Sequence, residues 1–196
     1  ARGYFQAFFG DAVREVLFVP YAGVTKSHDQ YVEQVRPVFA SLGIGVSGIH
    51  AVRDAHAAVR EAQAIVVGGG STWRLMRELR LAELLPAIRN RVIAGMPYAG
   101  WSAGSNIACP TIMTTNDMPI CDPGGFDALG LIPFQINPHY LHGNPPGFKG
   151  LPVTRDFDFT VESYAALVES FAAAEGFDVL VGHSYFANVL IEVAAR

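Results

Sequence analysis

The stretch GWSAG, residues 100–104, follows the apolar run MPYA (96–99) and leads directly into SNIAC (105–109). An apolar strand that ends in G-x-S-x-G and passes at once into a helix is typical of a nucleophile elbow. The two glycines would let strand and helix approach closely, while Ser102 adopts a positive φ. The pattern predicts a catalytic Ser102 with the Ala103 N–H as an oxyanion donor. The alternative is a glycine-rich turn with an ordinary serine.

Strands and helices alternate on the N-terminal side of the elbow. Short apolar runs predict strands, and apolar positions at helical spacing predict the helices between them. The expected strands cover 15–20, 44–49, 64–67 and 96–100, and the expected helices cover 4–13, 31–42, 54–62, 73–81 and 84–94. This order predicts an α/β fold, a three-layer sandwich with a mostly parallel sheet. Because the chain opens on half a helix, we also expect a further strand upstream of it.

Three glycines, residues 68–70, follow the predicted strand 64–67 and precede a predicted helix. The N–H groups of such a turn can bind an anion or an oxyanion, although a plain tight turn has the same sequence. The dinucleotide-binding pattern G-x-G-x-x-G is absent. Because the carboxyl ends of parallel strands meet at one edge of a sheet, we expect the glycines and Ser102 on the same rim.

Beyond the elbow, the segments TTNDMP (114–119) and CDPGG (121–125) are typical of loops. Residues 134–139 then predict a short strand that ends in His139. An elbow serine, a loop acid and a strand-end histidine follow one another in the order of a Ser/acid/His hydrolase on an α/β sheet. Asp117 either supports His139 directly or forms a local Asx turn.

Composition narrows the class of protein. The 196 residues are 51% hydrophobic and 16% charged, which suits one globular domain with a substantial core. A net charge of −4 without a basic cluster argues against nucleic acid or an acidic membrane as partner. No run resembles a signal peptide or a membrane span, so we expect a cytoplasmic protein. Two cysteines, Cys109 and Cys121, form neither a disulfide framework nor a zinc site.

Several of these stretches together resemble the peptidase E family, cytoplasmic α-aspartyl dipeptidases with a class I glutamine-amidotransferase-like fold. The similarity runs from about residue 16 to about residue 150, in order and at similar spacing. The stretches that carry it are FVPYAGVT (18–25), VVGGG (66–70), GWSAG (100–104), ACPT (108–111), TTNDMP (114–119) and QINPH (135–139).

The resemblance implies a serine dipeptidase that cleaves dipeptides with an N-terminal aspartate through an acyl-enzyme. It implies Ser102 as the nucleophile, His139 as the base and Asp117 as an acid needed for activity. The N–H groups of Gly70 and Ala103 would form the oxyanion hole. The family uses no metal or cofactor. We expect Asn137 to line the pocket, and a monomer or a homodimer.

Selectivity for aspartate requires a cation that faces the substrate side chain, most naturally an Arg that holds a carboxylate with two hydrogen bonds. The family carries such an Arg in a Thr-Arg pair shortly after the histidine. Here Thr154-Arg155 stands slightly later along the chain. Arg155 is therefore either the specificity residue or a solvent-facing side chain.

After about residue 150 the resemblance ends. The pattern predicts an amphipathic helix over 159–174, a strand over 177–181 and a second elbow-like turn, GHSYFA (182–187), before a helix from Asn188. This tail resembles the central piece of an α/β-hydrolase, except that Phe186 replaces the last glycine and no pair of an acid and a histidine follows Ser184. We therefore expect a peptidase E-like domain at 1–150 and a βα extension at 151–196 that packs on it. The alternatives are an esterase-like hydrolase that uses Ser184, and a catalytically impaired fragment or chimera that keeps the fold.

Overall fold

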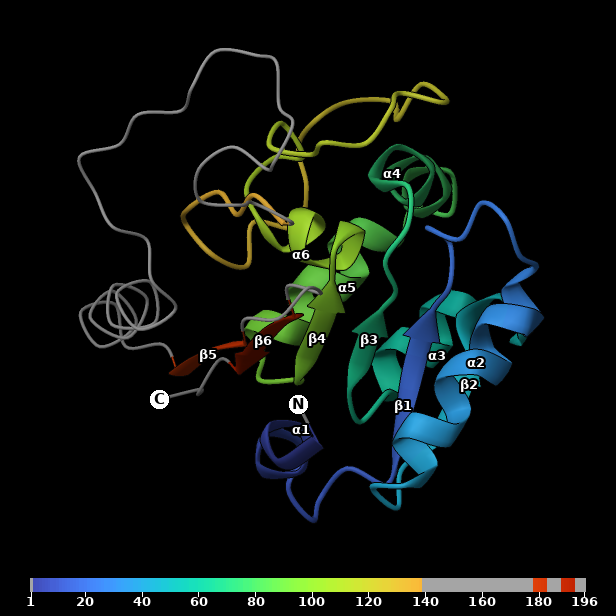
Figure 1. Ribbon diagram of the computed structural model, residues 1–196, viewed down its shortest axis with the longest axis vertical. Helices are drawn as coiled ribbons and strands as arrows, with labels where there is room; N and C mark the ends of the chain where they lie inside the picture. Colours follow the sequence, from blue (N-terminus) through green and yellow to red (C-terminus); the bar gives the residue numbers. More distant parts are fainter. Residues whose placement is uncertain (1, 139–177, 183–187, 193–196) are drawn as a thin grey trace, which may run out of the picture.

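The computed structural model describes residues 2–138, 178–182 and 188–192 (Figure 1). The predicted helix over 159–174 lies outside these residues, as do His139, Arg155 and Ser184. In chain order the elements are α1 (Arg2–Phe9), β1 (Glu15–Val19), α2 (His28–Ala40), β2 (Gly45–Gly48), the 3-10 helix η1 (Ile49–Ala51), α3 (Ala55–Glu61), β3 (Ile65–Val67), α4 (Thr72–Leu81), α5 (Leu84–Ile93), β4 (Tyr98–Trp101), α6 (Ala103–Ala108), β5 (Asp178–Gly182) and β6 (Asn188–Glu192). None of the helices within the described ranges has the length and hydrophobicity to cross a membrane.

The strands form one sheet in the order β2-β1-β3-β4-β6-β5. The first four strands are parallel, and each is joined to the next in sequence by a segment that contains a helix. β6 pairs antiparallel with β4, and β5 pairs antiparallel with β6. The predicted α/β fold with a mostly parallel sheet is therefore confirmed.

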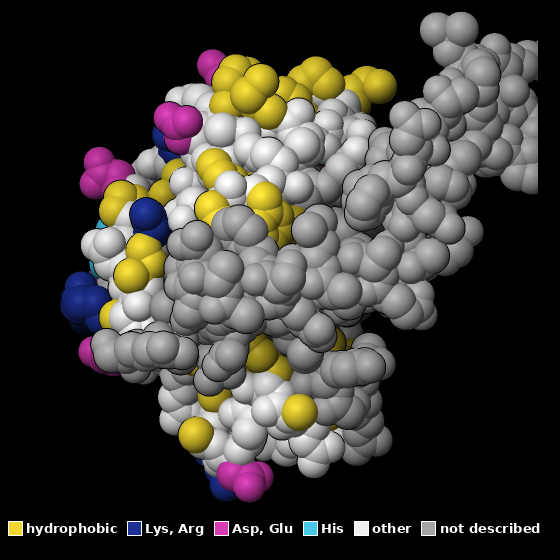
Figure 2. Space-filling view, turned by 90° about the vertical axis from the view of Figure 1, so that its left-hand side faces the viewer, with side chains coloured by type: hydrophobic (Ala, Val, Ile, Leu, Met, Phe, Trp, Pro, Cys, Tyr) yellow, Lys and Arg dark blue, Asp and Glu magenta, His cyan; other side chains and the backbone are white. Residues whose placement is uncertain are grey.

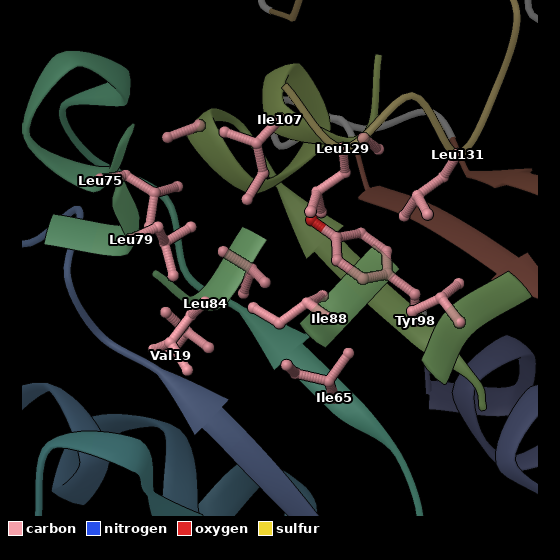
Figure 3. Close-up of a cluster of buried hydrophobic side chains, with 14 of the residues drawn as sticks. Val19, Ile65, Leu75, Leu79, Leu84, Ile88, Tyr98, Ile107, Leu129 and Leu131 are labelled. Carbon is pink, nitrogen blue, oxygen red and sulfur yellow. The ribbon is translucent and has the colours of Figure 1, made fainter. Parts of the chain in front are cut away.

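Helices cover both faces of the sheet, because successive side chains of a strand point to opposite faces. In β1, Val16 and Phe18 are buried in a cluster with side chains from α1 and α2. Leu17 and Val19 belong to a second cluster, to which α3, α4, α5 and α6 contribute. Figure 3 shows this second cluster, with Leu75, Leu84 and Ile107 against the strands. The result is the predicted three-layer arrangement.

Tyr98 joins the sheet to the helix that follows the elbow. Its ring is fully buried, and its hydroxyl donates a hydrogen bond of 2.6 Å to the carbonyl of Gly104 (Figure 3). Burial raises the pKa of the Tyr98 hydroxyl well above its usual value, so the group remains a donor. β4 and α6 are thereby fixed to each other at the point where the chain turns.

The predicted strand over 134–139 is wrong in its described part, residues 134–138. Side chains bind the backbone groups that a neighbouring strand would otherwise bind. The N–H of Ile136 donates to the Cys109 sulfur at 3.2 Å, and its carbonyl accepts from the Thr114 hydroxyl at 2.5 Å. The segment therefore runs as an irregular chain fixed by α6 and the loop that follows it.

The predicted helix from Asn188 is also wrong, because residues 188–192 form strand β6. This segment is rich in aliphatic residues, and Val189 and Ile191 are β-branched residues that favour strands. The edge of β4 offers unpaired backbone groups, and Tyr98 aligns there with Ile191. The strand predicted at 177–181 is confirmed as β5. We expected a strand, a turn and a helix around Ser184. The described parts of this segment, residues 178–182 and 188–192, are instead two antiparallel strands.

Candidate active site

Ser102 occupies a strained backbone position between β4 and α6. Its φ is 53° and its ψ is −111°, and Glu83 is the only other non-glycine residue with a positive φ in the described ranges. Its carbonyl accepts the N–H groups of Ser105 and Asn106, which closes the first turn of the helix. Such strain persists only where the surrounding structure enforces it, and it gathers at functional sites. The predicted nucleophile elbow is confirmed in its backbone geometry.

The flanking glycines are required by close packing. A Cβ on Gly100 would lie 2.7 Å from the carbonyl group of Gly104, and a Cβ on Gly104 would lie 2.4 Å from the carbonyl oxygen of Val67. Real side chains do not tolerate these separations. As predicted, both positions need glycine because strand and helix approach closely there. The elbow packs directly against the end of β3.

The triple glycine lies beside the elbow, as predicted. Gly70 has a φ of 135°, and a Cβ there would lie 2.2 Å from the Ala22 carbonyl oxygen, which also accepts the Ser71 N–H at 2.8 Å. A Cβ on Gly69 would lie 3.0 Å from the Ser102 Cβ. The turn after β3 and the turn after β4 therefore meet at one rim of the sheet.

Tyr31 links these two turns from the face of the sheet that α1 and α2 cover. Its hydroxyl donates to the Gly69 carbonyl at 2.9 Å and accepts from the Trp101 indole N–H at 3.2 Å. Phe18 stacks on Trp101 with ring centroids 5.8 Å apart. Burial raises the pKa of Tyr31, so its hydroxyl keeps the proton that it donates. Trp101 packs beneath the elbow.

Asp117 binds the helix that follows the triple glycine. Its Oδ2 accepts the N–H of Thr72 at 2.7 Å, and its carbonyl accepts the Trp73 indole N–H at 2.9 Å. A carboxylate at the N-terminus of α4 is favoured by the helix dipole. The carboxylate is thus anchored to a helix distant in sequence rather than to its own turn. Its predicted contact with His139 involves a residue outside the described ranges and stays a prediction.

The same loop holds the segment that leads to His139. The Asn116 side-chain N–H₂ donates to the Asn137 side-chain oxygen at 2.7 Å and to the Pro138 carbonyl at 3.3 Å. Together with the bond from Thr114 to Ile136, these contacts fix residues 136–138 against residues 114–116. The side-chain oxygen of Asn137, an expected pocket residue, is therefore engaged by the protein itself.

Two buried polar residues at the site were not singled out by the sequence analysis. Thr72 is fully buried and Asn106 is 3% exposed, and the Asn106 side-chain N–H₂ donates to the Thr72 hydroxyl at 3.1 Å. The Thr115 hydroxyl donates to the same oxygen at 3.1 Å. The available signal was the position of Asn106, a lone amide among the small and apolar residues of α6.

The loop after α6 carries several large hydrophobic side chains that are exposed. The exposed ones are Met113, Met118, Ile120 and Phe126. Figure 2 shows hydrophobic side chains gathered at the top of one face, at the height that this loop reaches in Figure 1. Within the described ranges, no three His, Cys, Asp or Glu side chains lie close enough together to hold a metal ion.

Comparison with known proteins connects this geometry to a family of peptidases. The chain matches the sequence model of peptidase family S51 over residues 1–184. It is 55% identical over 137 residues to peptidase E of Salmonella paratyphi A and of Salmonella gallinarum. These matches cover 70% of this chain, but only 60% and 58% of the two relatives. The chain thus spans about three fifths of the length of these curated relatives.

A solved structure shows a similar fold. It is the crystal structure of a protein described as a candidate peptidase E from Listeria monocytogenes EGD-e. The TM-score is 0.60 and the sequence identity is 28%. The superposition covers 71% of this chain and 74% of the other.

Proposed function

Because the chain belongs to peptidase family S51, we propose that it is a serine peptidase that hydrolyses dipeptides with an N-terminal aspartate. The observation that carries the proposal is the strained Ser102 at the end of β4, packed against the triple-glycine turn after β3. This arrangement supports acyl transfer because it presents a hydroxyl beside the N–H groups of two turns.

In the proposed reaction the Ser102 oxygen attacks the carbonyl carbon of the aspartyl residue while His139 takes the hydroxyl proton. The N–H groups of Gly70 and Ala103 stabilise the negative charge on the tetrahedral intermediate. His139 then protonates the leaving amine as the peptide C–N bond breaks, which leaves an aspartyl ester on Ser102. A water molecule then attacks the ester carbonyl while His139 takes one of its protons, and His139 passes this proton to the Ser102 oxygen as the ester C–O bond breaks and aspartate leaves.

The remaining assignments belong to the same proposal. Asp117 supplies a negative charge needed for activity, Arg155 binds the substrate side-chain carboxylate and Asn137 lines the pocket. The family resemblance supports a cytoplasmic protein that acts on small peptides, as a monomer or a homodimer.

Hydrolysis of an aspartyl dipeptide by the purified chain tests the proposal. Aspartyl-leucine should be cleaved by the wild-type chain, whereas Ser102→Ala should lose at least about 10³-fold in kcat because the nucleophile is gone. Ser184→Ala is the matched control and should keep the wild-type rate. Asparaginyl-leucine, which has the same shape without the charge, should be a poor substrate.

The esterase alternative gives a different result in the same assay. If Ser184 were the nucleophile, hydrolysis of a simple ester would survive Ser102→Ala and disappear in Ser184→Ala. If the chain were an inactive member of the family, neither the dipeptide nor the ester would be hydrolysed.

A further inference from the structure

We propose that Thr72 and Asn106 are positioning residues that hold the two arms of the oxyanion hole at a fixed separation. The inference rests on the proposed function, since it concerns the N–H groups of Gly70 and Ala103. One of these donors belongs to the turn that precedes α4, and the other opens α6. The catalytic geometry therefore depends on how these two helices are joined at their N-terminal ends.

The bond between Asn106 and Thr72 is a direct side-chain link between the two helices. Thr72 is the first residue of α4, two residues after Gly70, and Asn106 lies three residues after Ala103. The Asn106 N–H₂ donates to the Thr72 hydroxyl oxygen at 3.1 Å, and both side chains are buried. A single hydrogen bond thus connects points within one helical turn of each oxyanion donor.

Because both side chains are buried, losing this hydrogen bond is costly. A buried amide that loses its acceptor keeps the full cost of its desolvation, so the folded chain favours the arrangement in which the bond is made. The bond has a second support, because Thr72 also donates its backbone N–H to Asp117 and accepts from the Thr115 hydroxyl. Thr72 therefore joins α6, α4 and the loop after α6.

The two turns are also joined by Tyr31, which binds both, and by the packing of Gly69 against Ser102, whereas the bond from Asn106 to Thr72 joins the helices that follow the turns. The Gly70 backbone rests against Ala22, and Gly104 rests against Val67. These contacts fix Gly70 to the segment after β1 and Gly104 to β3, whereas the bond from Asn106 to Thr72 runs directly between α4 and α6. Loss of the bond should therefore change the reaction rate more than it changes the binding of substrate.

The rate at which a serine-directed fluorophosphonate modifies Ser102 measures this effect. The reagent needs the nucleophile and the oxyanion donors but no aspartyl side chain, so the result does not depend on the proposed substrate. The variants are Thr72→Ser, Thr72→Val and the double variant Thr72→Val with Asn106→Leu. Ser47→Ala is the control, because it removes a hydroxyl on β2 that binds Glu15 of β1, and two strands separate β2 from β4.

We expect Thr72→Val to slow the modification about 10- to 100-fold, and Thr72→Ser, which keeps the accepting oxygen, to stay within about threefold of the wild type. The double variant leaves no buried amide unpaired, so it should fold even if Thr72→Val does not, and it should stay slow. With aspartyl-leucine the same variants should lose kcat at nearly constant KM.

Three results would overturn the inference: equal rates for Thr72→Val and Thr72→Ser, recovery of the rate in the double variant, or no modification of Ser102 in the wild-type chain. A wild-type chain that is modified at Ser102 but does not cleave aspartyl dipeptides would refute the proposed substrate alone. The two proposals therefore fail in different experiments.

Discussion

At the scale of single residues, the backbone of Ser102 carries the main sign of function. Its φ of 53° and ψ of −111° lie in a region that glycine adopts far more readily than serine. A non-glycine residue held in such a sparsely populated region costs roughly 1–3 kcal/mol. A catalytic role of the Ser102 hydroxyl, as proposed, would explain why a serine occupies this strained position.

Replacement of Ser102 by glycine should therefore stabilise the fold while it abolishes the reaction. We expect Ser102→Gly to unfold at a free energy about 1 kcal/mol higher than Ser102→Ala, because only the alanine variant keeps the strained Cβ. Urea unfolding measures the difference in the free energy of unfolding between the two variants. Because both lack the Ser102 hydroxyl, loss of the hydroxyl's contacts affects the two equally. Equal stability would mean that the position is not strained.

At the scale of elements, the loop after α6 acts as a connector. Asp117 reaches the first turn of α4, and Asn116 reaches the segment before His139. The loop therefore connects the first turn of α4 with the segment that leads to His139, the proposed base. A change in this loop should therefore affect the start of α4 and the segment before His139 together.

The charge of Asp117 can be separated from its hydrogen bond to Thr72. An Asn side chain at this position can still accept the Thr72 N–H, so Asp117→Asn should lower the thermal midpoint only slightly. We expect kcat to fall about 10²- to 10⁴-fold, because the negative charge no longer supports the protonated base. The assay is aspartyl-leucine hydrolysis beside a thermal melt. Unchanged turnover would assign Asp117 a structural role only.

The elements that sequence predicted well are those whose own residues decide them. The buried run of β1 and the glycines around Ser102 are local signals. The Ser27 capping box of α2 is also local, but the sequence analysis did not use it and expected the helix at 31–42, whereas α2 spans His28–Ala40. The signals at 134–138 and 188–192 are not local. Cys109 and Thr114 bind the backbone of the first segment, and the distant edge of β4 pairs with the second. Short apolar runs such as 188–192 suit a strand or a helix until a partner is present.

The candidate site divides in the same way. Ser102 and Gly70 belong to short patterns with a steric meaning, so sequence alone identified them. Thr72 and Asn106 are ordinary residue types, and the role proposed for them rests on a bond between two side chains that are 34 residues apart in sequence. No local pattern encodes such a contact.

At the scale of the whole molecule, buried donors make the fold sensitive to alkali. Burial raises the pKa of the Cys109 thiol from 9.0 to about 11 and that of the Tyr98 hydroxyl well above 10.0. An unfolded chain releases these protons at lower pH than the folded chain does. The folded state therefore binds more protons in this range, and the free energy of unfolding falls as pH rises.

The contribution of Cys109 should be complete below about pH 9 and should disappear by about pH 11, with a slope of at most about 1.4 kcal/mol per pH unit. Urea unfolding at pH 8, 9 and 10 measures the slope. Cys109→Ala removes the thiol and should show a shallower slope, whatever its overall stability. Identical slopes for the two proteins would show that the thiol does not titrate differently on unfolding.

The proposed reaction depends on the hydroxyl of Ser102. After reaction with a fluorophosphonate, peptide mapping by mass spectrometry identifies the modified serine. We expect a single adduct on the peptide that contains Ser102 and none on the peptide that contains Ser184. An adduct at Ser184, or a folded chain that carries no adduct, would contradict the assignment of Ser102 as the nucleophile.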